Sequence, residues 1–171
     1  ARADVAHILR VNITDSRLHL SVENNSFAVI PHATIYITYC KLKGLVVNHS
    51  GEVTCIEPIE TDYLGIVQNG NGRINLQIST HVLDATLTKA GSLKLSGSAD
   101  KVTLLNTGCA NIDSIDLEAS EGKVTIKGSG DIAIRVEDEL SMLLEGEGRL
   151  HLKGEPRMKS LTMDRPITIS I

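Results

Sequence analysis

The chain has 171 residues, a formal net charge of −4, and 42% hydrophobic against 22% charged residues. This length and balance are typical of one folded domain and exclude a largely disordered chain. Lys and Arg are scattered along the sequence, which argues against nucleic acid or an anionic membrane surface as a partner, since both need a basic patch. The prediction is a single domain over residues 1–171.

The chain begins ARADVAHILRV, without the positively charged start and apolar core of a signal peptide. It also lacks an initiator Met, which is compatible with a signal peptide that has been removed. No apolar run approaches the roughly 18–20 residues that span a bilayer. The sequence therefore predicts no transmembrane segment.

The N-terminal part alternates between apolar and polar residues in two segments, LRVNITDSRLHLSV (9–22) and ATIYITY (33–39). Between and after them, PHA (31–33) and EPIETD (57–62) interrupt any regular spacing. Such a region is typical of an irregular cap, which protects an exposed strand edge.

From residue 45 to 155 the sequence repeats. Each repeat has a turn that ends in a small residue and is followed two positions later by an apolar one. The turn residues are Gly51, Gly72, Gly91, Ala110, Gly130 and Gly148, at intervals of 21, 19, 19, 20 and 18 residues. The apolar residues are Val53, Ile74, Leu93, Ile112, Ile132 and Leu150. Because the spacing is nearly constant, each repeat is interpreted as one structural unit.

Strict alternation follows each turn, as in Ile132, Ile134 and Val136, which is typical of a half-buried strand. A second strand precedes each turn, as in KVTIKG before Gly130. A unit of about 20 residues with short strands and glycine corners is one rung of a β-solenoid, whose apolar face is buried only by stacking. The corner glycines are expected to adopt positive φ or to allow close approach to the next rung.

The predicted fold is therefore an all-β, single-stranded parallel β-solenoid with an irregular N-terminal cap. The apolar ladder should run from Val53 to Leu150, beside a second ladder of Cys55, Leu76, Leu95, Ile134 and Leu152. About eight rungs at about 4.8 Å spacing would give a rod near 40 Å long. The segment RPITISI (165–171) could close it. A β-sandwich of hairpins is the alternative, weakened by the absence of regularly spaced two-residue NG or DG hairpin turns.

The sequence offers few groups for chemistry. The aromatic residues are Phe27, Tyr36, Tyr39 and Tyr63, so the chain after Tyr63 lacks aromatic stacking platforms. The cysteines lack CxxC spacing, and we expect Cys55 to pack as a small apolar residue, although a Cys40–Cys55 disulfide remains open. No metal-binding spacing appears among the histidines, which are His7, His19, His32, His49, His81 and His151.

The repeated segments SGEVTCIEP, NGNGRINLQI, AGSLKLSGSAD, KGSGDIAIRVEDEL and EGEGRLHLKGEP resemble the bacterial head GIN domain, an autotransporter adhesin head, over about residues 9–156. The resemblance implies a right-handed parallel β-helix in an exported, cell-envelope setting, and a molecular role that is undefined. This chain departs from the family pattern at Ala110, which replaces a turn glycine, in GEG for GSG, and at His151, where an aromatic is common. The family carries no functional residues to transfer.

The sequence argues against a dinucleotide site, a calcium site and a glycosidase active site. GNGRIN and GSGDIA lack the third glycine and the following helix of a dinucleotide site. Only one turn places an Asp, Asp131, directly after its glycine, and the period of about 20 residues is unlike the nine-residue period of a calcium β-roll. A glycosidase needs two carboxylates roughly 5–9.5 Å apart. Three acidic clusters could supply such a pair, but each lies at a strand end or turn, where acids are simply solvated. The clusters are Glu137 with Asp138 and Glu139, Glu145 with Glu147, and Asp113 with Asp116.

The resulting hypothesis is a non-catalytic structural or binding module of the cell envelope, without cofactor or metal, whose partner is a glycan or a surface protein. It could also oligomerise. A carbohydrate-active β-helix enzyme and a protein-assembly module are the alternatives. The step from fold to function is analogy.

Overall fold

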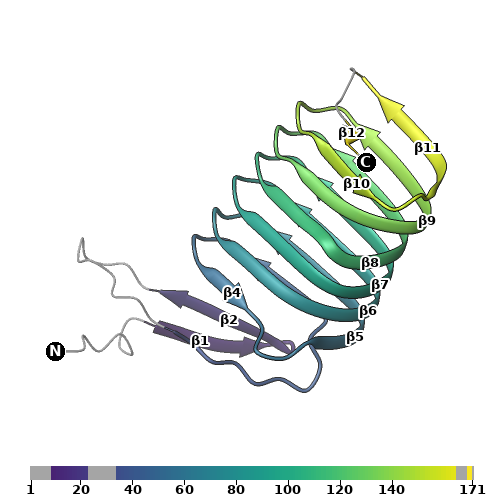
Figure 1. The fold of residues 1–171 in the computed structure, drawn as a ribbon. Coiled ribbons are helices and arrows are strands. Elements are labelled where there is room, and N and C mark those ends of the chain that lie inside the picture. The colour runs from purple at the N-terminus through teal and green to yellow at the C-terminus, as the bar shows by residue number, and fades with distance from the viewer. Residues whose placement is uncertain (1–8, 23–33, 165–168, 171) are drawn as a thin grey trace. The chain divides into compact units, whose positions relative to one another are not determined.

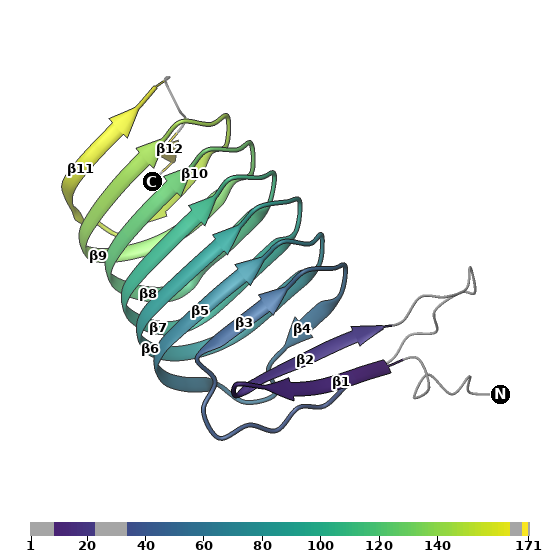
Figure 2. The same cartoon turned by 180° about the vertical axis from the view of Figure 1, so that it is seen from behind.

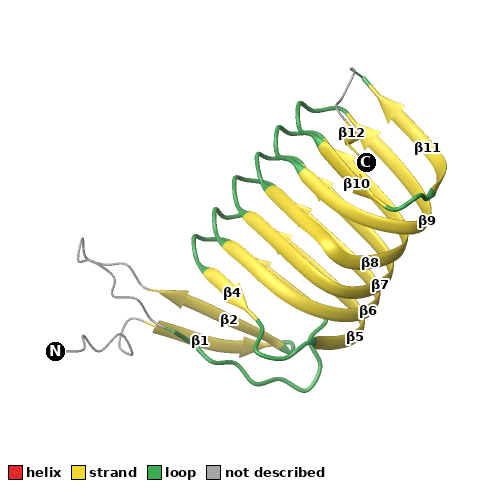
Figure 3. Cartoon of the chain, viewed as in Figure 1, coloured by secondary structure: helices red, strands yellow, loops and turns green. Residues whose placement is uncertain are grey.

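The computed structural model describes residues 9–22, 34–164 and 169–170. The chain divides into two compact units, residues 1–39 and 40–171. In the described residues the regular elements are strands (Figure 3). That the whole of 1–171 forms one domain stays a prediction. Within these ranges there is no helix of the length and apolarity that a membrane crossing requires.

The first unit contains a β-hairpin of β1 (Leu9–Thr14) and β2 (Arg17–Val22), which pair antiparallel. Asp15 and Ser16 connect the two strands with φ angles of 51° and 60°. Two successive positive φ angles define the hairpin turn that matches the twist of its strands. The sequence predicted alternation over residues 9–22 but no turn within it, because Asp15 and Ser16 are not the Asn-Gly or Asp-Gly pair typical of such turns. The capping role of this region stays a prediction.

The second unit is a parallel β-solenoid of about six turns, with roughly 19 residues per turn (Figure 1). Its strands are β3 (Gly44–Val47), β4 (Glu52–Thr54), β5 (Ile59–Gln68), β6 (Arg73–Leu87), β7 (Ser92–Asn106), β8 (Asn111–Ile126), β9 (Ile132–Leu144), β10 (Leu150–Lys153), β11 (Arg157–Met163) and β12 (Ile169–Ser170). They form a ten-stranded sheet whose neighbouring strands pair in parallel, with β11 pairing with β9 and β4 with β6. Parallel stacking confirms the solenoid and excludes the hairpin sandwich.

The predicted apolar ladder is confirmed pair by pair. Val53 lies beside Ile74, Ile74 beside Leu93, Leu93 beside Ile112, Ile112 beside Ile132, and Ile132 beside Leu150. The five residues from Ile74 onward are at most 2% exposed. Regular alternation sets this register, because a shift of one residue would turn every apolar side chain to solvent.

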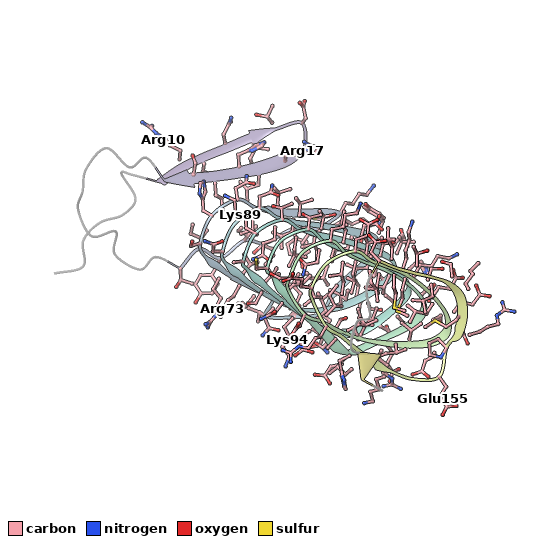
Figure 4. The ribbon with its side chains drawn as sticks, turned by 90° about the horizontal axis from the view of Figure 1, so that it is seen from above. Arg10, Arg17, Arg73, Lys89, Lys94 and Glu155 are labelled. Atoms are coloured by element: carbon pink, nitrogen blue, oxygen red, sulfur yellow. The ribbon has the colours of Figure 1, made fainter. Side chains whose placement is uncertain are left out.

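A second set of inward side chains comes from the later half of each long strand and meets the first ladder across the coil interior. It includes Leu64, Leu83, Val102 and Leu140, each at most 1% exposed. Side chains from both halves of the coil thus fill the interior, and their burial is the main force that holds the rungs together. Figure 4 shows Arg73 and Lys94 pointing outward from the coils.

The two ends of the solenoid differ from the sequence reading in number and detail. The prediction of about eight rungs was wrong, since the solenoid has about six turns. Its coils begin only after residue 40, and the preceding strands form a hairpin. The EPIETD segment does break the first coil, where β4 ends at Thr54 and β5 begins at Ile59. At the other end, β12 pairs with β10, as a closing strand would. Residues 165–168 and 171 of the predicted closing segment RPITISI lie outside the described residues.

Candidate functional site

Turns of four or five residues connect successive coils and stack along one edge of the solenoid (Figure 3). The six predicted turn residues, Gly51, Gly72, Gly91, Ala110, Gly130 and Gly148, each occupy the fourth position of a turn. Backbone hydrogen bonds join the turns, as where the Arg73 N–H donates to the Gly51 carbonyl at 2.8 Å and the Ser92 N–H to the Gly72 carbonyl at 3.0 Å. The turn stack is therefore a continuous extension of the sheet.

Close approach between coils accounts for glycine at this edge. A Cβ on Gly130 would collide with the carbonyl oxygen of Ala110, and one on Gly148 with the carbonyl oxygen of Gly130. Among the described glycines, positive φ occurs at Gly97 and Gly154, which lie elsewhere in the coil. Of the two reasons expected for turn glycine, it is the close approach that operates in these turns.

Two buried amides support the turns from inside. Asn106 donates from its Nδ2 to the Ala110 carbonyl at 2.6 Å and accepts the Gly108 N–H at 3.2 Å. Gln68 donates to the Gly72 carbonyl in the same way. Both side chains are at most 1% exposed. Sequence reasoning missed them, although a polar residue at an otherwise apolar ladder position is the available signal.

The later halves of the long strands, with β3 and β11, form a broad sheet face that we call the late-strand face (Figure 2). One outward position on it forms a register-aligned row across seven strands. We call this row the outer column: Val46, Val67, Thr86, Leu105, Thr125, Leu143 and Thr162. It carries only methyl-bearing side chains and hydroxyl groups and is uncharged. Such a row presents an ordered, partly apolar surface to solvent.

Members of the three acidic clusters that could have formed a glycosidase pair lie in ion pairs, several of them between coils. Glu139 binds Arg157 and Lys159, Glu145 binds Lys127 at 3.0 Å, and Asp113 lies 3.8 Å from Lys94. Glu137 binds Arg135 at 2.7 Å. The sequence reading overlooked these bases, because most of the partners lie about one coil apart in the chain. The hydrogen bonds from Lys159 and Arg157 lower the pKa of Glu139, whereas a glycosidase acid must hold a proton.

Asp131, the acid that follows a turn glycine, is also held by a base on the next coil. Its carboxylate accepts hydrogen bonds from the Arg149 side chain at 2.7 and 3.1 Å and from the Arg149 backbone N–H at 2.9 Å. These bonds lower the pKa of Asp131 below its usual value. The residue fastens two adjacent turns.

The described histidines and cysteines do not assemble a metal site: no group of three or more His, Cys, Asp or Glu side chains there is suitably placed. Cys40, Cys55 and Cys109 are free thiols, so the Cys40–Cys55 disulfide is not formed. Cys55 packs partly against the core, as expected. His7 and His32 lie outside the described residues, and so does Phe27.

The described residues also line a shallow, open hollow on the last coil. It is formed by His151, Leu152, Lys153, Gly154 and Glu155. The hollow is mostly open to solvent, unlike the enclosed pockets that bury most of a small ligand. The late-strand face is therefore the better candidate for a binding surface.

Parallel coils, stacked glycine turns and a continuous outer sheet face define a β-solenoid module, and comparison with known proteins gives its family. The family described as "Putative auto-transporter adhesin, head GIN domain" matches residues 1–156. The chain belongs to this family. None of the curated proteins matches it.

Two solved structures share the fold. A putative adhesin from Bacteroides fragilis is 27% identical, with a TM-score of 0.90 over 98% of this chain and 78% of that chain. A putative lipid binding protein from Parabacteroides distasonis is 18% identical, with a TM-score of 0.64 over 97% of this chain and 80% of that chain. The second likeness is one of fold alone.

Proposed function

We propose that this chain is a non-catalytic binding module of the bacterial cell envelope that attaches to glycan-rich surfaces through its late-strand face. The observation that carries the proposal is the outer column, in which seven side chains on seven paired strands share one register. Hydroxyl and methyl groups alternate along much of this row. An extended glycan offers the matching pattern of hydroxyl groups and apolar ring faces.

Rigidity supports this role. The coils are joined by continuous parallel pairing and by buried ladders, so the outer column keeps its geometry without a ligand. A surface ordered before binding loses little entropy when it binds. Many weak contacts along such a row would then add to useful avidity.

The adhesin names of the family and of the Bacteroides fragilis structure agree with the proposal. They also support an exported location, at the cell surface or in the periplasm, which is part of the proposal. Absence of catalysis is a further part, and the ion-paired state of the candidate carboxylates supports it. The name of the Parabacteroides distasonis structure raises lipid as a second ligand class. The coil interior is filled by core side chains, so an acyl chain would have to lie on the outside.

A glycan array that includes mucin-type and bacterial envelope polysaccharides tests the proposal. The natural chain is expected to show saturable binding to a subset of the array. Leu105→Arg places a long charged side chain in the middle of the outer column and should abolish that binding. Asn75→Arg, at an exposed position on the opposite half of the coil, is the matched control and should bind normally. Equal binding by both variants would remove the late-strand face from the proposal.

A further inference from the structure

Tyr63 is the only aromatic residue of the chain after position 39. It lies in β5 on the late-strand face, and 43% of its surface is exposed. Its ring leans along the strand over Gly65: the hydroxyl oxygen and Cε1 lie 3.2 and 3.4 Å from where a Cβ of Gly65 would be. The partly exposed ring offers a rigid apolar surface on the candidate binding face, against which a ligand can pack.

Two glycines lie next to the ring. Gly44 lies directly beside Gly65 in the register of β3 and β5, so two adjacent coils carry no side chain at this outward position. Val46 and Val67 of the outer column flank the glycine pair, and Val46 is 61% exposed. Because the ring itself lies over Gly65, its outer face and the neighbouring Gly44 backbone form the surface that a flat ring-shaped ligand would contact.

Hydrogen-bonding groups lie at the edge of the same patch. The Tyr63 hydroxyl donates to the carboxylate of Asp84, which lies beside Gly65 on the next coil, and this bond raises the pKa of Tyr63. Thr86 and Thr103 are the neighbouring outward hydroxyls. A carboxylate acceptor with two hydroxyls favours a neutral ligand that carries hydroxyl donors. It disfavours a phosphate or another anion, as does the net charge of −4.

We propose that Tyr63 is a stacking platform for the apolar face of a pyranose ring, and that Asp84 accepts a hydrogen bond from one of its hydroxyl groups. This inference rests on the proposed function, because it locates one sugar subsite within the late-strand face. The sugar would lie over the ring and the adjacent Gly44 backbone. The rest of the glycan would extend along the outer column.

A purely structural role for Tyr63 makes different predictions. If the ring only covers the backbone of Gly65, its loss should lower stability and leave sugar binding unchanged. If it is a platform, removal of the ring should weaken binding while the exposed position keeps the effect on stability small. Affinity and stability measured on the same variants therefore distinguish the two roles.

The test is a titration of the full chain with soluble hexasaccharides of β-linked glucose, N-acetylglucosamine and galactose, and with a mannose hexasaccharide, by isothermal calorimetry and saturation-transfer NMR. The variants are Tyr63→Leu, which removes the ring, and Tyr63→Phe, which keeps the ring and loses the bond to Asp84. Gly65→Ala pushes the ring aside, since its Cβ would sit 3.2 Å from the tyrosine oxygen. Gly51→Ala is the matched control, because nothing lies within 4 Å of its Cβ position.

At least one hexasaccharide should bind the natural chain, with saturation transfer from the tyrosine ring. Tyr63→Leu should weaken that binding about tenfold or more, and Tyr63→Phe by no more than about threefold. Gly65→Ala should weaken it, and Gly51→Ala should not. Undiminished binding by Tyr63→Leu overturns this inference and leaves the proposed function standing. No binding of any hexasaccharide by the natural chain overturns the inference, and silence on the glycan array as well overturns the proposed function.

Discussion

Gln68 and Asn106 occupy the same inward position at the end of the coil, two coils apart, with Leu87 between them in the register. Each donates its side-chain amide to the carbonyl four residues further on. They differ in their acceptor atoms, since Asn106 Oδ1 receives the Gly108 N–H, whereas Gln68 Oε1 is buried without a partner among the described residues. The buried amide that supports the turn is thus fully hydrogen-bonded at Asn106 and only partly hydrogen-bonded at Gln68.

Replacement of these two residues by leucine should therefore have unequal effects. Asn106→Leu leaves the Ala110 carbonyl and the Gly108 N–H without their partner and should lower the free energy of unfolding by about 1–3 kcal/mol. Gln68→Leu loses one bond but also removes an unsatisfied buried oxygen, so it should lower it by less than about 1 kcal/mol. Urea denaturation of both variants measures the difference. A larger loss for Gln68→Leu would contradict this account of the turns.

The turn edge should be intolerant of a methyl group where the coils approach closely. Gly130→Ala forces a Cβ against the carbonyl of Ala110 and should lower the free energy of unfolding by about 2–3 kcal/mol. Gly51→Ala, with open space at its Cβ position, should change it by no more than about 0.5 kcal/mol. Thermal unfolding of the pair is the measurement. Equal melting temperatures would show that the turns relax freely.

His81 should titrate above its ordinary range. Its Nδ1 lies 2.6 Å from the Asp100 carboxylate on the next coil, and this hydrogen bond raises the pKa of His81 above 6.5. Because the folded pKa is raised, the pair's contribution to stability is fully present below pH 6.5 and is lost as the pH rises through the folded value. An NMR titration of the imidazole measures the pKa. Asp100→Asn should lower it, and an unchanged value would mean that the pair does not form in solution.

Glu139 fastens β11, the outermost long strand, to β9. It binds both Arg157 and Lys159, which lower its pKa below 4.5. The stabilisation is present above pH 4.5 and is lost as the pH falls through the folded value. Glu139→Gln should speed amide hydrogen exchange in residues 157–163 and leave exchange in β7 unchanged, because opening of an edge strand is local. Faster exchange in both strands would indicate that the whole solenoid depends on this contact.

The apolar ladder could be predicted residue by residue because it repeats a local pattern. Ile74, Leu93 and Ile112 each follow a turn at the same distance, and stacking preserves that distance as a register. Constant spacing also located the turn residues from Gly51 to Gly148. The alternation of apolar and polar residues therefore predicted both the length of the repeat and which side chains face inward.

What the sequence could not predict depends on contacts between coils or on local irregularity. Arg135 binds Glu118, and Asp131 binds Arg149, across one coil of chain, and outward residues follow no period that would pair them. The register also shifts in β8 between Ser114 and Glu118, where extra residues bulge from the ladder. The Tyr63 patch was missed because its glycines come from two different coils. Only the register places Gly44 beside Gly65.

The central claim is that glycans bind on the late-strand face. Amide chemical-shift mapping of the isotope-labelled chain, titrated with a glycan that binds it on the array, tests this most directly. The account predicts shifts concentrated along the outer column and around Tyr63 and Asp84, with little change at Asn75 and Lys94 on the other half of the coil. Shifts confined to the hollow around His151, or to the early halves of the strands, would contradict it.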